Sequence, residues 1–107
     1  IDLLNMSSCK NKKHKIPKSE EINKNQETLK AIADPTRLKI LYLLQDGELC
    51  VCQIHEGINK SQSTISHHLN ILKKAEIIKM RKEGIWNYYS LSNPKLIKHL
   101  NKIFKGE

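Results

Sequence analysis

The sequence predicts a mainly α-helical fold with one β-hairpin, in the order α-α-α-α-β-β-α. Apolar residues recur at helical spacing over most of the chain, and their period shortens towards two only between Ile78 and Leu91. Glu83-Gly84 places a turn signal inside that stretch, as expected for a hairpin. With 107 residues, the chain has room for one domain of this kind.

The composition narrows the class of protein. Lys and Arg number 19 against 11 Asp and Glu, and the net charge of +8 favours a polyanionic partner, with nucleic acid as the first candidate. At 38% hydrophobic residues, wholesale disorder is excluded. No apolar run approaches the roughly 20 residues of a membrane span, so no membrane partner is expected. Three cysteines without a secretory segment indicate free thiols in a cytoplasmic protein rather than a disulfide framework.

The N-terminal part divides into an arm and a first helix. Residues 1–18 are expected to form a flexible basic arm, because lysines are dense from Lys10 onward and apolar residues are scarce. A domain over residues 19–107 then begins with Ser19 as an N-cap followed by two acids. Its first helix carries apolar residues near helical spacing at Ile22, Leu29, Ile32 and Ala33.

Two short helices are expected next. Asp34-Pro35 breaks the first helix and starts the second, with Asp34 as N-cap and Pro35 in the first turn. This helix is apolar nearly all round, which predicts burial, and Asp46-Gly47 ends it. A third helix is expected from about Glu48 to Glu56, where Gly57 stops it.

The fourth helix is expected from Gln62 to about Ala75, with Ser61 as its N-cap. Its apolar residues are spaced i, i+4, i+7 and form one face: Ile65, Leu69 and Leu72. The remaining surface of the helix is polar. His68 directly precedes Leu69 in the apolar face, which favours a packed core histidine at this position.

The C-terminal part supplies the hairpin and a last helix. Strands are expected over residues 78–82 and 86–91, and Asn93-Pro94 is expected to N-cap the helix that follows. Two short helices, a longer polar-faced helix and a basic hairpin together describe a winged helix-turn-helix. The terminal helices carry apolar stripes, which predict that they form the contact of a homodimer.

The polar helix face and the hairpin supply the candidate DNA contacts. Short polar side chains near a helix N-terminus suit base edges and phosphates, and basic side chains suit phosphates. The candidates are Lys60, Ser61, Gln62, Ser63, Thr64, Ser66, His67, Lys73, Arg81 and Lys82. The expected partner is double-stranded operator DNA, with two-fold symmetry to match a homodimer.

No enzymatic activity is expected. The sequence contains no His-Glu-x-x-His, no Gly-x-Ser-x-Gly and no Gly-rich phosphate loop. Asp34 and Glu48 are better explained as helix-start residues than as a catalytic carboxylate pair. No organic cofactor is indicated.

Cys50 and Cys52 are candidate metal ligands. In a regular helix, residues two apart point about 200° apart and cannot share an ion, whereas in an extended or frayed first turn they can. A soft ion would then favour one arrangement of this helix start and DNA the other, so that each ligand weakens the other. Two thiolates seldom suffice for a tight site, and three or four ligands are expected.

Four segments resemble the ArsR/SmtB family of metal-responsive repressors. Residues 33–41 (ADPTRLKIL) are similar to the family's helix-two signature, and residues 63–75 to its recognition helix. Arg81-Lys82-Glu83-Gly84 followed by Tyr88-Tyr89-Ser90-Leu91 resembles the wing, and Glu48-Leu49-Cys50-Val51-Cys52 the thiol metal box. The resemblance covers about residues 27–92 and implies a repressor that releases its operator when metal binds.

The resemblance leaves two completions of the thiol site open. In the cadmium/lead-sensing branch, arm cysteines, usually of the other protomer, complete the site; Cys9 matches one, and His14 is the nearest substitute for the second. In the arsenite-sensing branch, a third cysteine stands where this chain has His55. Cys9, Cys50 and Cys52 would suit As(III), Sb(III), Pb(II) or Bi(III), and an added His14 or His55 would suit Cd(II) or Zn(II).

Two alternatives stay open on the same scaffold. In a redox sensor, thiol oxidation would replace the metal. A Cys50–Cys52 disulfide would close a very tight ring, so an intermolecular bond to Cys9 is expected to be the more credible oxidised form. The other alternative is a DNA-binding module with incidental cysteines and no ligand.

Overall fold

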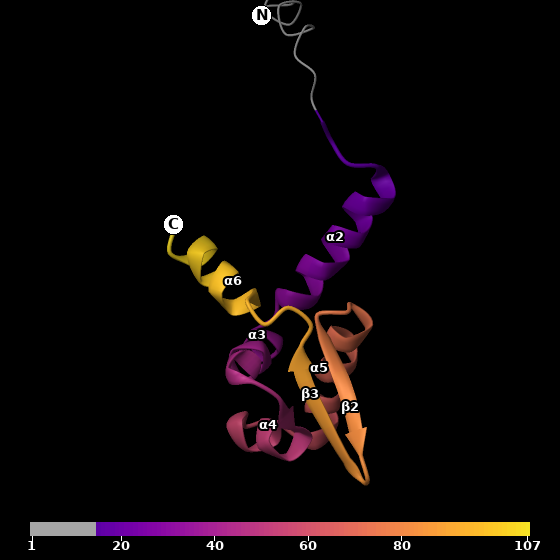
Figure 1. Ribbon diagram of the computed structural model, residues 1–107, viewed down its shortest axis with the longest axis vertical. Helices are drawn as coiled ribbons and strands as arrows, with labels where there is room; N and C mark the ends of the chain where they lie inside the picture. The colour runs from indigo at the N-terminus through magenta and orange to yellow at the C-terminus, as the bar shows by residue number, and fades with distance from the viewer. Residues whose placement is uncertain (1–14) are drawn as a thin grey trace, which may run out of the picture.

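The computed structural model describes residues 15–107, in which a helical body carries a three-stranded antiparallel sheet (Figure 1). The elements in chain order are α2 (Ser19–Ile32), α3 (Pro35–Leu43), the 3-10 helix η2 (Leu44–Asp46), β1 (Leu49–Cys50), α4 (Val51–Gly57), α5 (Gln62–Lys74), β2 (Ile78–Glu83), β3 (Trp86–Leu91) and α6 (Leu96–Phe104). This is the predicted order with one added strand, and it confirms the winged helix-turn-helix class. Among the described helices, none is long and apolar enough to cross a bilayer.

The core lies between α3, α4, α5 and the sheet. The α5 stripe supplies three of its fully buried side chains, as its i, i+4, i+7 spacing predicts. The largest fully buried side chains are Ile40, Leu41, Leu44, Ile54, Ile65, Leu69, Leu72 and Ile78. This packing holds α5 against the body by its apolar face and leaves its polar face on the surface.

Helix starts follow the predicted caps at two of four positions. The Asp34 carboxylate accepts a hydrogen bond from the backbone N–H of Arg37 at 3.0 Å, and the Ser61 hydroxyl accepts one from that of Thr64 at 3.2 Å. The N-cap of α2 is Lys18 rather than Ser19, and no side chain caps it. The helix therefore begins one residue earlier than the predicted N-cap, Ser19, implies.

Two other predicted helix boundaries are wrong. The third helix begins at Val51 rather than near Glu48, because Leu49 and Cys50 are extended and pair with Tyr89 and Tyr88 of β3. A two-residue strand has no periodicity of its own, so its existence depends on a partner about 40 residues away in sequence. The last helix begins at Leu96, after a turn in which the Asn93 side chain accepts from the Lys95 N–H at 3.0 Å.

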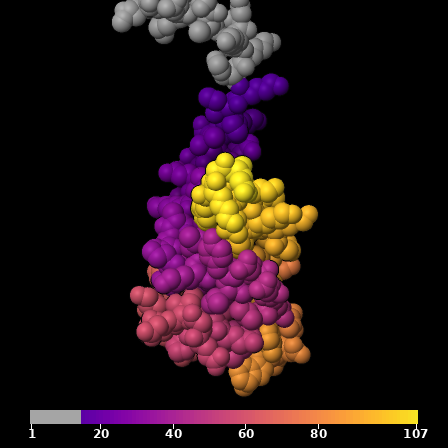
Figure 2. All heavy atoms as spheres, turned by 90° about the vertical axis from the view of Figure 1, so that its left-hand side faces the viewer, coloured from indigo at the N-terminus to yellow at the C-terminus, as the bar shows by residue number. Residues whose placement is uncertain are grey.

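Helices α2 and α6 extend from the end of the body opposite the tip of the β2–β3 hairpin (Figure 1). Figure 2 shows α2 rising beyond the rest of the described body. Both helices leave large apolar side chains exposed: Ile22 at 42%, Leu29 at 65%, Ile103 at 69% and Phe104 at 53%. These side chains belong to the predicted dimer contact, which stays a prediction for a single chain.

Candidate functional site

The N-terminal half of α5 presents the predicted polar face. The Ser61 hydroxyl lies 3.2 Å from that of Ser63 and donates to that of Thr64 at 2.8 Å, so these groups stabilise the helix start. The other predicted contacts on or beside α5 are exposed: Lys60, Gln62, Ser66, His67 and Lys73. The structure thus places all of them where a DNA duplex could reach, and their contacts with DNA stay a prediction.

On the other side of α5, His68 connects the helix to α3. Its side chain is only 14% exposed, and its Nδ1 lies 3.0 Å from Nη1 of Arg37. Arg37 also donates through Nε to the carbonyl of Ala31 at 2.6 Å. Because a guanidinium can only donate, the contact requires an unprotonated Nδ1 and a neutral imidazole. The expectation of a packed histidine is confirmed.

Acid should weaken the fold through His68. Burial holds the pKa of His68 below its ordinary value of 6.5, although Asp34 raises it from 3.8 Å away. Between pH 6.5 and that lower pKa, the unfolded chain binds a proton that the folded chain does not, so stability falls as the pH falls. We expect His68→Gln to remove this part of the loss in urea unfolding compared at about pH 7.5 and about pH 5.5. The exposed His67→Gln is the matched control, and an unchanged pH dependence in His68→Gln would contradict the assignment.

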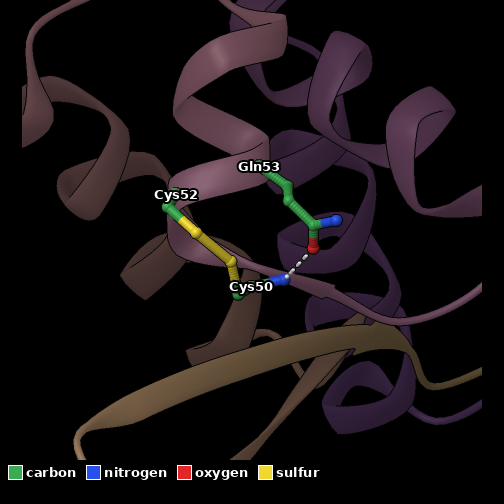
Figure 3. Close-up of a disulfide and its surroundings, with 3 residues drawn as sticks. All are labelled: Cys50, Cys52 and Gln53. Carbon is green, nitrogen blue, oxygen red and sulfur yellow. Dashed lines mark hydrogen bonds between the residues drawn. A yellow bond between two sulfur atoms is a disulfide. The ribbon is translucent and has the colours of Figure 1, made fainter.

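Cys50 and Cys52 lie where β1 passes into α4. Cys50 is both the last residue of β1 and the N-cap of α4, with extended backbone angles of φ −78° and ψ 159°. A disulfide joins it to Cys52, and their Cα atoms are 5.4 Å apart (Figure 3). The Gln53 side-chain oxygen accepts from the backbone N–H of Cys50 at 2.9 Å, which ties the helix start to the end of the strand.

This disulfide corrects two expectations: that both thiols are free, and that the Cys50–Cys52 ring is too tight to be the credible oxidised form. The expected intermolecular bond to Cys9 lies outside the described residues. The extended backbone at Cys50 turns its side chain towards Cys52, an arrangement that a regular helix would forbid. The predicted exception, an extended first turn that brings both sulfurs together, is the geometry found. Metal ligation by this pair therefore requires that the disulfide first be reduced to two thiolates.

A complete metal site is not formed by the described residues. Within residues 15–107, no group of three or more His, Cys, Asp or Glu side chains could hold a metal ion. His55 is exposed on α4 and does not join both cysteines in such a group. Once reduced, Cys50 and Cys52 fit a soft ion chemically but supply only two ligands. The other predicted ligands, Cys9 and His14, lie outside the described residues.

The thiol pair lies beside α5 and the sheet. A cavity of about 380 Å³ is lined by Val51, Cys52, His55, Glu56, Gln62, Ile65 and Trp86. A second hollow of about 430 Å³ is lined by Cys50, Cys52, Gln53, Trp86 and Tyr88. The first connects the exposed Cys52 to the first residue of α5, and both include the only tryptophan of the chain. Cys52 therefore borders the same cavity as Gln62 of α5 and Trp86 of β3.

The two basic hairpin residues differ in their surroundings. Lys82 is exposed on β2, with no ion pair among the described residues. Arg81 donates to both carboxylate oxygens of Glu48, from Nε at 3.1 Å and from Nη2 at 2.7 Å, and from Nη1 to Glu83 at 2.7 Å. Hydrogen bonding to Arg81 holds the pKa of Glu48 below its ordinary value. Sequence reasoning did not find this network, because Glu48 lies 33 residues before Arg81.

Comparison with known proteins adds a family match over the helical core. A model of bacterial regulatory proteins of the arsR family matches residues 34–80. An uncharacterized HTH-type transcriptional regulator of Methanocaldococcus jannaschii is 59% identical over 71 residues, covering 65% of this chain and 80% of that protein.

Two further relatives carry metal-resistance names. A homologue of the cadmium resistance transcriptional regulatory protein CadC from Staphylococcus aureus is 46% identical, over 73% of this chain and 65% of that protein. The arsenical resistance operon repressor of Bacillus subtilis is 43% identical, over 71% of this chain and 73% of that protein.

Solved structures share the fold. HlyU from Vibrio cholerae superposes with a TM-score of 0.72 at 32% identity, covering 84% of this chain and all of that one. The homodimeric winged helix-turn-helix DNA-binding domain of a possible ArsR-family regulator from Mycobacterium bovis gives a TM-score of 0.72 at 25% identity, covering 88% of this chain and 94% of that one.

Proposed function

The chain belongs to the ArsR family of bacterial regulatory proteins, and on that premise we propose that it is a repressor that releases DNA when a soft metal ion binds Cys50 and Cys52. The observation that carries the proposal is the position of Cys52, which shares one cavity with Gln62 at the start of α5. An ion held there acts on the helix expected to read DNA.

In this proposal the thiol pair controls DNA affinity because an ion favours an arrangement of the β1–α4 junction other than the disulfide-closed one. Cys50 is held in β1 by pairing with Tyr88, and Cys52 is held in the first turn of α4. A soft ion would bridge the two thiolates and a further ligand. The sulfurs would move to accept it, and so would the residues of α4 that line the cavity shared with Gln62 of α5 and Trp86 of β3. By linkage, DNA and the ion then weaken each other equally.

We propose an ion of the class Cd(II), Pb(II), Zn(II), Bi(III), As(III) or Sb(III). The relatives named for cadmium and arsenical resistance support this class. Cys9, His14 and His55 remain the candidates for the additional ligands, since the described residues contribute two sulfurs.

We further propose that the repressor acts as a homodimer on a two-fold symmetric operator. The exposed apolar residues of α2 and α6 are the side chains that such a contact would cover. The homodimeric neighbour from Mycobacterium bovis supports this arrangement. A monomeric mass in solution at micromolar concentration would contradict it.

Metal binding is tested by titrating the fully reduced protein with Cd(II) and, separately, with As(III) in the absence of oxygen. We expect an ultraviolet thiolate-to-metal charge-transfer band that saturates at one ion per protomer and is abolished in Cys52→Ser. The same titration of Cys9→Ser reports whether Cys9 is a ligand. Absence of the band with both ions would contradict the metal proposal.

A second candidate function is supported by the disulfide between Cys50 and Cys52. In this alternative, oxidation of the pair changes DNA affinity without any metal. The two thiols lose two electrons and two protons to an oxidant such as hydrogen peroxide, which is reduced to water. The test compares DNA affinity of the oxidised and reduced protein under a chelator. Equal affinities would exclude it.

A further inference from the structure

The guanidinium of Arg81 contacts three protein side chains, although the arginine side chain is 51% exposed. Glu48 accepts from it with both carboxylate oxygens, Glu83 accepts at its other terminal nitrogen, and its central carbon lies 4.7 Å from the centre of the Tyr88 ring. A bidentate pair combined with a ring contact specifies the position of the arginine much more closely than a single exposed ion pair.

These contacts span the whole sheet, whose strand order is β1-β3-β2. Arg81 on β2 is the register partner of Tyr88 on β3, and Tyr88 is in turn the partner of Cys50 on β1. From β2 the Arg81 side chain passes over Tyr88 and reaches Glu48, which lies next to the first residue of β1. One side chain thus ties the wing to the strand that carries Cys50.

We propose that Arg81 positions the wing for DNA through Glu48 instead of contacting DNA itself. The cluster carries one positive and two negative charges, so a DNA phosphate at Arg81 would have to approach two carboxylates at close range. Lys82, exposed beside it, remains available for phosphate. Arg81 is then a positioning residue, and Glu48 is as important for DNA affinity as Arg81 is.

Because the contact between Arg81 and Glu48 lies close to Cys50, the wing is expected to respond to the state of the thiol pair. Glu48 and Cys50 are separated by one residue, so a change at the end of β1 moves both the partner of Arg81 and the partner of Tyr88. This part of the inference rests on the proposed function, namely that the state of Cys50 and Cys52 controls DNA affinity. The positioning role itself needs only DNA binding.

The test compares Glu48→Gln, Arg81→Gln and the double variant by fluorescence anisotropy with a duplex that the wild-type protein selects from a random library. The control is Glu76→Gln, which removes one negative charge from the turn between α5 and β2 without touching Arg81. Each protein is measured with the thiols reduced and oxidised, and over a range of salt. Thermal unfolding reports whether a variant is still folded.

We expect Glu48→Gln and Arg81→Gln each to lower DNA affinity by about fivefold or more, and the double variant to lose no more than either one. The salt dependence should be unchanged, and the ratio between the two thiol states should shrink. Glu76→Gln should bind DNA at least as tightly as wild type. The variant Glu48→Gln is decisive, because it removes a negative charge and yet should weaken binding to a polyanion.

Three other results would each contradict one part of this account. If Glu48→Gln binds DNA as well as or better than wild type, while Arg81→Gln lowers the salt slope by about 0.9 per protomer, Arg81 is a phosphate contact and the proposal is overturned. If wild type responds to its thiol state but Glu48→Gln responds by the same ratio, the link to the thiols is overturned. If wild type responds neither to its thiol state nor to Cd(II), the proposed function fails, and loss of affinity in Glu48→Gln would still support the positioning role.

Discussion

Raising monovalent salt from about 50 mM to about 200 mM is expected to weaken DNA binding by a factor of about 10⁴–10⁶. The net charge of +8 and the exposed lysines beside α5 and on the hairpin predict about four to six phosphate contacts per protomer. Each contact releases condensed counterions and contributes about −0.9 to the slope of log affinity against log salt, and a dimer doubles the number. The slope is measured by anisotropy on the selected duplex.

Replacement of single lysines should show which positions contribute to this salt dependence. Lys82→Gln on the hairpin is expected to make the slope less steep by about 0.9 per protomer. Lys102→Gln removes the same charge from α6, at the end of the body away from the hairpin tip, and should leave the slope unchanged (Figure 1). A slope that Lys82→Gln leaves unaltered, or that both variants change equally, would contradict a DNA face formed by α5 and the wing.

Replacing Leu69 by alanine is expected to lower the free energy of unfolding by about 2–5 kcal/mol. Leu69 is 1% exposed and belongs to the α5 stripe that holds the helix on the core. Its loss removes buried apolar area and leaves a cavity among leucine and isoleucine side chains. Such a loss is a large part of the total stability of a small domain.

The measurement is urea unfolding at neutral pH, with Asn70→Ala as the matched control on the next residue of α5. Asn70 is exposed, so its replacement should change the free energy of unfolding by no more than about 0.5 kcal/mol. A loss of less than about 1 kcal/mol in Leu69→Ala would show that the face of α5 has been assigned incorrectly.

The elements that the sequence predicts well are those with dense local signals. The stripe of α5, the cap at Ser61 and the turn at Gly84, whose φ is +60°, all lie within a few residues of the structure they determine. Strand β1 was missed because two residues show no alternation. Its formation depends on Tyr88 and Tyr89, which are far away in sequence.

The residues of the candidate site could be predicted from the sequence, but the contacts between them could not. The spacing of Cys50 and Cys52 indicated a thiol site and an extended first turn, whereas the disulfide depends on backbone angles set by the pairing of β1. The contacts of Arg81 with Glu48 and Tyr88 depend on strand order, which a single sequence does not display. The basic side chain of Arg81 in the hairpin suggested a DNA contact, and the carboxylates around it became visible only in three dimensions.

The most direct test of the central proposal measures DNA affinity of the reduced protein with and without Cd(II), in wild type and in Cys52→Ser. The probe is the selected duplex, at constant salt and without oxygen. We predict that Cd(II) weakens wild-type binding by about 5- to 150-fold, that a chelator restores it, and that Cys52→Ser does not respond. Unchanged wild-type affinity under Cd(II) concentrations that saturate the charge-transfer band would contradict metal-controlled release.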